Sequence, residues 1–182
     1  MREDLRRRLR ELGMAKGVRE LAASPASIPR QDSDSVPRST AIEDLVSGRF
    51  HTTSHGRCFV AEELYRLDYI HGDLPLSSFL ELPSDIVAQV ARDGELVDVD
   101  LRRVCFFDTE TTGLSGGAGT MAFIVGLGFF VEDNFCVRQY FLRDPGDEPA
   151  MIEALTECLP EFEALASFNG RAFDAPIIEN RF

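Results

Sequence analysis

The sequence has 182 residues, enough for one domain with an appendage, and its 44% hydrophobic and 27% charged content is ordinary for a globular protein. The longest apolar run, Met121 to Val131, is shorter than the roughly 20 residues that cross a bilayer. The charged residues Arg2, Glu3 and Asp4 argue against a secretory signal at the N-terminus. These features predict a cytoplasmic protein with no membrane partner.

The net charge of −12 is unevenly distributed along the chain. Residues 1–38 hold nine basic and six acidic residues, whereas residues 39–182 hold ten basic and twenty-five acidic residues. Such an acidic body argues against a protein that binds nucleic acid by counterion release alone. It is compatible with an enzyme whose site is a cluster of carboxylates that binds divalent cations.

The cysteine and histidine residues match no pattern of zinc ligands. Four cysteines are widely spaced and form no CxxC pair, so we expect buried, reduced thiols. The spacing of His51, His55, Cys58 and His71 also fits no zinc site, and surface or turn positions are expected for these histidines.

Residues 1–40 are predicted to form a basic arm and a linker. Arg2 to Gly13 has the pattern of a short helix, with Leu5, Leu9 and Leu12 on one face. Its basic face either contacts phosphates or belongs to a solvated arm. Residues 22–40 are rich in Ser, Pro and Asp, which predicts a disordered linker.

Residues 41–100 are predicted to form a small α+β accessory subdomain. Two strand-like runs, Gly48 to Thr53 and Arg57 to Tyr65, are joined around His55 and Gly56. A helical pattern follows, with Ser84 as its expected N-cap and Gly94 as its end.

Residues 101–182 predict three strands, a helix, a strand and a second helix. The short connections between the first three strands favour antiparallel pairing. The first helix is expected to begin at Asp147 or Glu148 and to end at Pro160. The predicted strands and second helix are Val104–Phe107, Met121–Val131, Phe135–Leu142, Ala164–Phe168 and Phe173–Phe182.

Two carboxylates follow the first of these strands at alternate positions. Because strand residues alternate faces, Asp108 and Glu110 are expected to project to the same side. Two neighbouring carboxylates repel each other, and a divalent cation removes that penalty. Hard cations such as Mg²⁺ or Mn²⁺ prefer carboxylate oxygens. A D-x-E triplet by itself would more often be a solvated strand end.

The residues around these carboxylates resemble a known family. The string Phe107 to Leu114, FDTETTGL, resembles the first motif of the DnaQ-like (DEDD) 3′–5′ exonucleases. Ser167 to Pro176 resembles the second motif of that family, N-x-x-F-D-x-P. The glycine-rich stretch Ser115 to Thr120 fits no P-loop, and together with Asp68 to Gly72 it most resembles the YprB-type branch.

The resemblance implies an α/β fold and a metal-dependent reaction. The fold would be an RNase H-like mixed sheet of order βββαβα, without its C-terminal strand and helices. The activity would be a two-metal-ion 3′–5′ exonuclease that cleaves DNA or RNA with two Mg²⁺ or Mn²⁺ ions. Its partners would be a nucleic-acid 3′ end and, in the YprB-type branch, a helicase involved in DNA repair.

Residue roles follow from the same resemblance. Asp108, Glu110 and Asp174 would be the catalytic metal ligands. Leu114 and Phe173 would line the substrate pocket or belong to the core. The full set expected to bind substrate is Thr109, Thr111, Gly113, Leu114, Asn169 and Phe173.

The sequence departs from the family pattern at one point. The family uses a fourth carboxylate and a His or Tyr before it, and after Asp174 only Glu179 remains. We therefore expect an incomplete exonuclease domain that is inactive alone. The alternatives are a non-catalytic nucleic-acid-binding or scaffold module, which retains the first motifs, and a phosphohydrolase of small nucleotides.

Overall fold

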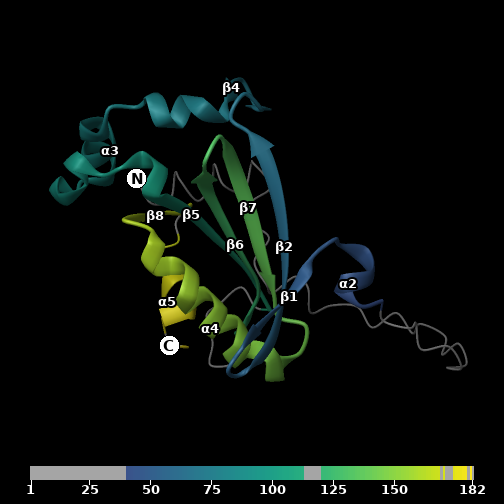
Figure 1. Ribbon diagram of the computed structural model, residues 1–182. Helices are drawn as coiled ribbons and strands as arrows, with labels where there is room; N and C mark the ends of the chain where they lie inside the picture. The colour runs from purple at the N-terminus through teal and green to yellow at the C-terminus, as the bar shows by residue number, and fades with distance from the viewer. Residues whose placement is uncertain (1–39, 113–119, 169, 171–173, 180, 182) are drawn as a thin grey trace, which may run out of the picture. The chain divides into compact units, whose positions relative to one another are not determined.

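The computed structural model describes residues 40–112, 120–168, 170, 174–179 and 181, which belong to one compact unit (Figure 1). The predicted basic arm and linker, and most of the glycine-rich stretch, lie outside these residues. None of the described helices is long and apolar enough to span a bilayer.

A mixed sheet of six strands, in the order β1-β2-β7-β6-β5-β8, is the centre of this unit. Neighbouring strands are antiparallel, except that β5 and β8 run parallel. The strands are β1 (Arg49–Thr53), β2 (Gly56–Arg66), β5 (Val104–Thr111), β6 (Ala122–Val131), β7 (Asn134–Phe141) and β8 (Ala164–Ala166). A separate two-stranded sheet contains β3 (Ile70–His71) and β4 (Leu74–Pro75).

Four α-helices are described, α2 (Ile42–Leu45), α3 (Ser84–Ala91), α4 (Glu148–Cys158) and α5 (Asp174–Glu179). Short 3₁₀ helices connect the other elements: η2 (Leu76–Glu81), η3 (Gly94–Asp98), η4 (Leu101–Arg103), η5 (Pro145–Asp147) and η6 (Leu159–Glu161). The order β5-β6-β7-α4-β8-α5 confirms the predicted βββαβα arrangement. Ser84, the expected N-cap of α3, is instead its first residue, because Pro83 occupies the cap position.

The predicted hairpin in residues 41–100 is part of the large sheet. Strand β2 pairs with β7 from Phe59 opposite Phe141 to Arg66 opposite Asn134. The antiparallel ladder between β2 and β7 is therefore continuous over these eight residue pairs. The hairpin and the strands of residues 101–182 thus form one continuous sheet.

One face of the sheet carries the main hydrophobic core, and helix α4 covers it. Met151, Ala154, Leu155 and Cys158 follow the i, i+3, i+4, i+7 pattern on α4, so they share one face, and all are buried. They pack with sheet residues such as Cys105 and with Ile178 of α5. Helices α4 and α5 consequently lie on the same side of the sheet (Figure 1).

The opposite face of the sheet is covered only near its two ends by the described residues. Near one end, Ile42 and Val46 pack against a small cluster that includes Phe59 and Phe141. Near the other end, the ring of Phe79 in η2 lies 5.0 Å from that of Phe106, measured between centroids. The middle of this face is where the first two predicted carboxylates are found.

Candidate active site

Strand β5 carries Asp108 and Glu110 on the less covered face of the sheet. The strand continues to Thr111, so both carboxylates lie within it rather than after it. Phe107, which precedes Asp108, points into the main core and is buried. Asp108 and Glu110 are exposed on the other face, as expected from the alternation of side chains along a strand. Within the described part of the chain, neither carboxylate has an ion pair or a side-chain hydrogen bond. Among these residues, nothing competes with a ligand for the two carboxylates.

A hollow of about 720 Å³ lies beside Asp108 on this face. Gly126, which pairs with Asp108 in β6, has no side chain, so the floor of the hollow is backbone at that point. Phe168 lines the hollow, and its side chain is 94% exposed. Exposing a large apolar ring to water is unfavourable in free energy. The space and the free aromatic face are suited to a planar, partly polar ligand.

Asp174, the third predicted carboxylate, is the first residue of helix α5 and contacts β5 at Thr109. It is only 9% exposed, and its Oδ1 atom accepts a hydrogen bond from the Thr109 hydroxyl. Thr109 alternates with Asp108 and Glu110, so its side chain points to the opposite face of the sheet. The structure brings Asp174 to β5, and among the described residues no three metal-ligating side chains are grouped together.

The corner before α5 is closely packed around Asp174. A Cβ atom at Gly170 would overlap the side chain of Ser167 and would lie 3.0 Å from Asp174 Oδ2. This approach requires a glycine at position 170 for steric reasons. A side chain at position 170 would therefore crowd both Ser167 and Asp174.

The residues expected to bind substrate are only partly described. Thr109 contacts Asp174, and Thr111 is half-buried next to an irregularity in the β5–β6 pairing. The other four, Gly113, Leu114, Asn169 and Phe173, lie outside the described residues.

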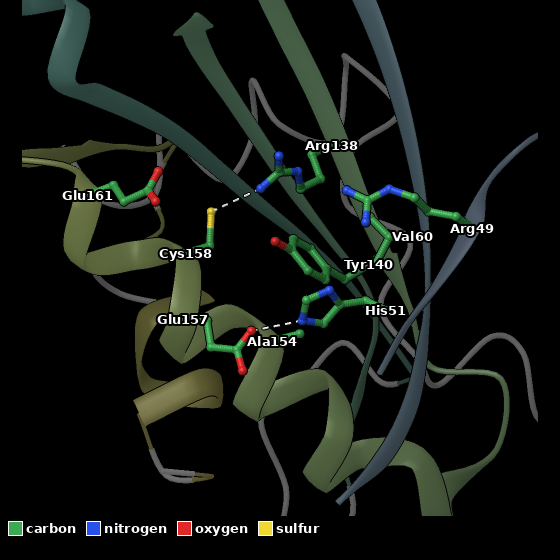
Figure 2. A pocket seen from close by; sticks show the side chains of 9 residues that line it. All are labelled: Arg49, His51, Val60, Arg138, Tyr140, Ala154, Glu157, Cys158 and Glu161. Atoms are coloured by element: carbon green, nitrogen blue, oxygen red, sulfur yellow. Dashed lines mark hydrogen bonds and ion pairs between the residues drawn. The ribbon is translucent and has the colours of Figure 1, made fainter. Parts of the chain in front are cut away.

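A second pocket, of about 190 Å³, lies between the sheet and α4 on the other face (Figure 2). Its Arg138 donates to Cys158 Sγ over 3.3 Å and forms an ion pair with Glu62. Because these groups satisfy one another, the pocket has few free polar atoms to offer a ligand. We regard its polar groups as part of the packing of α4 on the sheet.

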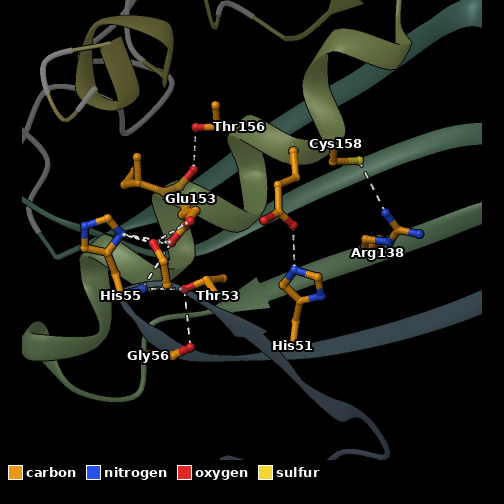
Figure 3. Close-up of polar contacts among 11 residues, drawn as sticks. His51, Thr53, His55, Gly56, Arg138, Glu153, Thr156 and Cys158 are labelled. Atoms are coloured by element: carbon orange, nitrogen blue, oxygen red, sulfur yellow. Dashed lines mark hydrogen bonds and ion pairs between the residues drawn. The ribbon is translucent and has the colours of Figure 1, made fainter.

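The histidines of the β1–β2 hairpin pair with acidic residues of α4, which the sequence pattern did not indicate. His51 Nε2 lies 2.8 Å from Glu157 Oε2, and His55 Nδ1 lies 2.8 Å from Glu153 Oε2 (Figure 3). Hydrogen bonds from His55 and Ser54 lower the pKa of Glu153 to about 2. These contacts attach the hairpin to the helix.

All four cysteines are buried free thiols, as the sequence predicted. Burial raises the pKa of Cys58 to about 11 and that of Cys105 to about 12. Both thiols therefore stay protonated at neutral pH and act as small apolar side chains.

Comparison with known proteins identifies the family of the C-terminal part. Residues 105–182, which contain Asp108, Glu110 and Asp174, match the RNase H superfamily. This part of the chain is an RNase H superfamily domain. Members of this superfamily are typically nucleases that use divalent metal ions. The six-stranded mixed sheet with its helices is consistent with an RNase H-like fold.

One relative extends the similarity beyond the RNase H superfamily domain. The chain is 34% identical to the uncharacterized protein YprB of Bacillus subtilis (strain 168) over 128 residues, which are 68% of the chain. The match spans 30% of the length of YprB. The similarity therefore concerns one part of a considerably longer relative.

Proposed function

We propose that the chain carries part of a two-metal-ion 3′–5′ exonuclease that acts on DNA or RNA, with Asp108, Glu110 and Asp174 as its carboxylates. One observation carries this proposal. Asp108 and Glu110 are exposed on one face of β5 and have no ion pair or side-chain hydrogen bond among the described residues, and Asp108 lines a hollow, within an RNase H superfamily domain. A structural pair of carboxylates would instead be expected to have basic partners nearby.

Two of the three predicted carboxylates fit the binding of a divalent cation. Asp108 and Glu110 offer carboxylate oxygens, the ligand type that Mg²⁺ and Mn²⁺ prefer, and no described side chain competes for them. Asp174 has the right chemistry, but Thr109 engages one of its oxygens. We therefore propose that Asp108 and Glu110 would hold the cation, whereas Asp174, which contacts the opposite face of β5, is included as the third carboxylate on the family resemblance alone.

In the proposed reaction, the protein supplies position and charge. Two bound ions would stabilise the entering and leaving oxygens of the phosphodiester. Asp108 and Glu110 would hold the ions at the sheet surface, and the hollow beside Asp108 would accept the terminal nucleotide. The exposed ring of Phe168 offers a face on which a base can stack.

Calorimetry with Mn²⁺ tests the site directly. We expect saturable Mn²⁺ binding to the 182-residue chain, and loss of at least about tenfold in affinity in Asp108→Asn and in Glu110→Gln, since each substitution removes a charged ligand. Asp85→Asn, which neutralises an exposed carboxylate of α3, is the matched control and should bind as the wild type does. Mn²⁺ binding that is absent, or equal in all four proteins, would contradict the proposal.

Nuclease assays test the reaction and its substrate. Single- and double-stranded DNA and RNA labelled at the 3′ end, together with a mononucleotide, would be incubated with Mn²⁺ or with EDTA. The family pattern uses a fourth carboxylate that was not found in residues 1–182, so we expect little or no cleavage by these residues alone and cleavage by a polypeptide that includes such a motif. Digestion that persists in EDTA or in Asp108→Asn would exclude this mechanism.

A non-catalytic nucleic-acid-binding or scaffold module is the second candidate. The observation that favours it is the engagement of Asp174 by Thr109, away from the face that carries Asp108 and Glu110. Such a module would bind labelled oligonucleotides equally well with Mn²⁺ and with EDTA. The helicase partner belongs to the first candidate and rests on the resemblance to the YprB-type branch.

A further inference from the structure

An aromatic pocket of about 480 Å³ lies on the face of the sheet that carries Asp108 and Glu110. Phe106 lines it and lies two residues before Asp108 on β5, so both side chains point to the same face. Its volume is in the range of sites that bind small molecules. Six of its nine lining residues are phenylalanine or tyrosine: Tyr65, Tyr69, Phe79, Phe106, Phe130 and Phe135.

The strand register supports the floor of the aromatic pocket. Tyr65 of β2 pairs with Phe135 of β7, and Phe135 pairs with Phe130 of β6. Residues that pair across strands point to the same face, so these side chains form a row across the sheet. The Phe130 and Phe135 rings lie 5.0 Å apart, measured between centroids. A Cβ atom at Gly128 would lie 2.7 Å from Phe135 Cζ, so this ring lies over bare backbone of β6.

The segment that follows β2 supplies another side of the aromatic pocket. The rings of Tyr65 and Tyr69 lie 4.9 Å apart between centroids. The Leu76 N–H donates to the Tyr69 carbonyl over 3.0 Å, which holds Tyr69 next to the start of η2. Tyr69 is nevertheless 48% exposed, so part of its ring is open to a ligand. His71 adds an imidazole, whose nitrogen atoms can contact the polar edge of a planar ligand.

The aromatic pocket adjoins the hollow beside Asp108. Phe106, Phe135 and Val137 line both of them. Two residues along a strand span about 7 Å, which is therefore the separation of Phe106 and Asp108 along β5. A nucleic-acid strand with one nucleotide at Asp108 has its neighbouring nucleotide within reach of the aromatic pocket.

The lining favours a base of a single strand over other ligands. None of the nine lining side chains is Lys or Arg, so the aromatic pocket is unsuited to phosphate. Every base has a flat π face that stacks on aromatic side chains. The bases of a duplex are already stacked and paired, and removing one from the stack is costly. An extended peptide would need hydrogen-bond partners for its N–H and C=O groups, and this lining offers few.

We propose that the aromatic pocket binds an unpaired base of a single-stranded nucleic acid, on the nucleotide next to the one at Asp108. The inference deepens the proposed function, because it selects single strands as the substrate class. Its link to the 3′ end rests on the proposed function, whereas binding of a base in the aromatic pocket requires no cation.

Tyrosine fluorescence measures occupancy of the aromatic pocket in the wild type. The chain has three tyrosines and no tryptophan, and two of the three, Tyr65 and Tyr69, line the aromatic pocket. Adenosine in EDTA should quench this fluorescence saturably, after correction with free tyrosine for absorbance by the base. Ribose 5-phosphate, which lacks a base, should leave it unchanged. Adenosine is uncharged, so added salt should change its affinity little.

Anisotropy of a labelled single-stranded oligonucleotide in EDTA measures the contribution of single residues. Tyr69→Ala should bind it about 5- to 150-fold more weakly, and Tyr69→Phe, which keeps the ring, should bind as the wild type does. Leu74→Ala is the matched control, because Leu74 is 63% exposed in β4 and does not line the aromatic pocket. If Tyr69→Ala folds poorly by circular dichroism, Tyr65→Ala should show the same loss. A duplex of the same sequence should compete about tenfold more weakly or worse.

The outcomes separate this inference from the proposed function. If Mn²⁺ binds through Asp108 but adenosine causes no quenching, or if Tyr69→Ala binds the single strand as the wild type does, the inference is overturned and the proposed function stands. If no Mn²⁺ binds while adenosine quenches and Tyr69→Ala weakens binding, the proposed function fails and the base site stands. Under both proposals, Mn²⁺ should strengthen binding of the oligonucleotide further in the wild type but not in Asp108→Asn.

Two further results would overturn the inference. Equal competition by the duplex and the single strand would remove the selection of single strands. A tyrosine signal that depends on protein concentration and not on adenosine would assign the aromatic pocket to contact with a second copy of the chain.

Discussion

At the scale of single residues, Glu153 shows how a short turn is attached to a helix. Its carboxylate accepts hydrogen bonds from the Ser54 hydroxyl and the His55 backbone, and it lies 2.8 Å from His55 Nδ1. All three groups belong to the turn between β1 and β2, while Glu153 belongs to α4. The ionised carboxylate thereby connects segments about one hundred residues apart in sequence.

This attachment predicts a specific dependence of stability on pH. The pKa of Glu153 in the folded protein is about 2, below its ordinary value of 4.5, so its contribution is complete above pH 4.5 and is lost as the pH falls through 2. Glu153→Gln should therefore be less stable than the wild type at pH 5, and the difference should shrink towards pH 2. Urea unfolding at several pH values measures it.

An exposed glutamate of η2 serves as the control for this measurement. Glu81→Gln changes the same chemical group outside the turn and should follow the wild type at every pH. A constant difference between Glu153→Gln and the wild type from pH 5 to pH 2 would contradict the role assigned to Glu153.

At the scale of elements, helix α4 stabilises the sheet through a few fully buried side chains. Leu155 is 0% exposed and contacts the main core, so Leu155→Ala should lower the free energy of unfolding by about 2–5 kcal/mol. Chemical denaturation provides the measurement. Val90→Ala in α3 is the control, because Val90 is 81% exposed and its loss should cost under about 0.5 kcal/mol.

The outcome of that comparison bears on the candidate site. Ile178 of α5 packs into the same core as α4, and α5 begins at Asp174. If Leu155→Ala and Val90→Ala lowered the free energy of unfolding by similar amounts, packing of α4 would not be a main source of stability for this core. The position of α5 would then depend on other contacts.

At the scale of the whole described unit, β8 leaves one edge of the sheet without a partner strand among the described residues. Such an edge carries free N–H and C=O groups that can pair with another chain. Leu165 of β8 is 57% exposed, so pairing of this edge with another chain would also bury apolar surface. We expect self-association of the chain at high concentration.

A charged residue at the edge should reduce that association. Leu165→Lys should lower the mean particle size in dynamic light scattering, because lysine on an edge strand opposes pairing. Leu45→Lys introduces the same charge at a 69% exposed position in α2, away from the edge, and should leave the particle size near that of the wild type. An equal reduction in both variants would attribute the effect to net charge alone.

The sequence by itself determined the features that depend on local periodicity. The order of strands and helices in residues 101–182, the shared face of Asp108 and Glu110 and the burial of the cysteines all follow from patterns of two or about four residues. A strand alternates faces whatever lies around it, so the first two carboxylates could be placed together from sequence.

Only the tertiary structure decided the contacts between distant segments. It placed Asp174 on Thr109 rather than among the other carboxylates, joined β2 to β7 in one sheet, and attached His51 and His55 to α4. These contacts join residues 65 to 106 positions apart or pair strands whose partners are not neighbours in sequence. Their geometry depends on how side chains pack in three dimensions, which local patterns of residues do not encode.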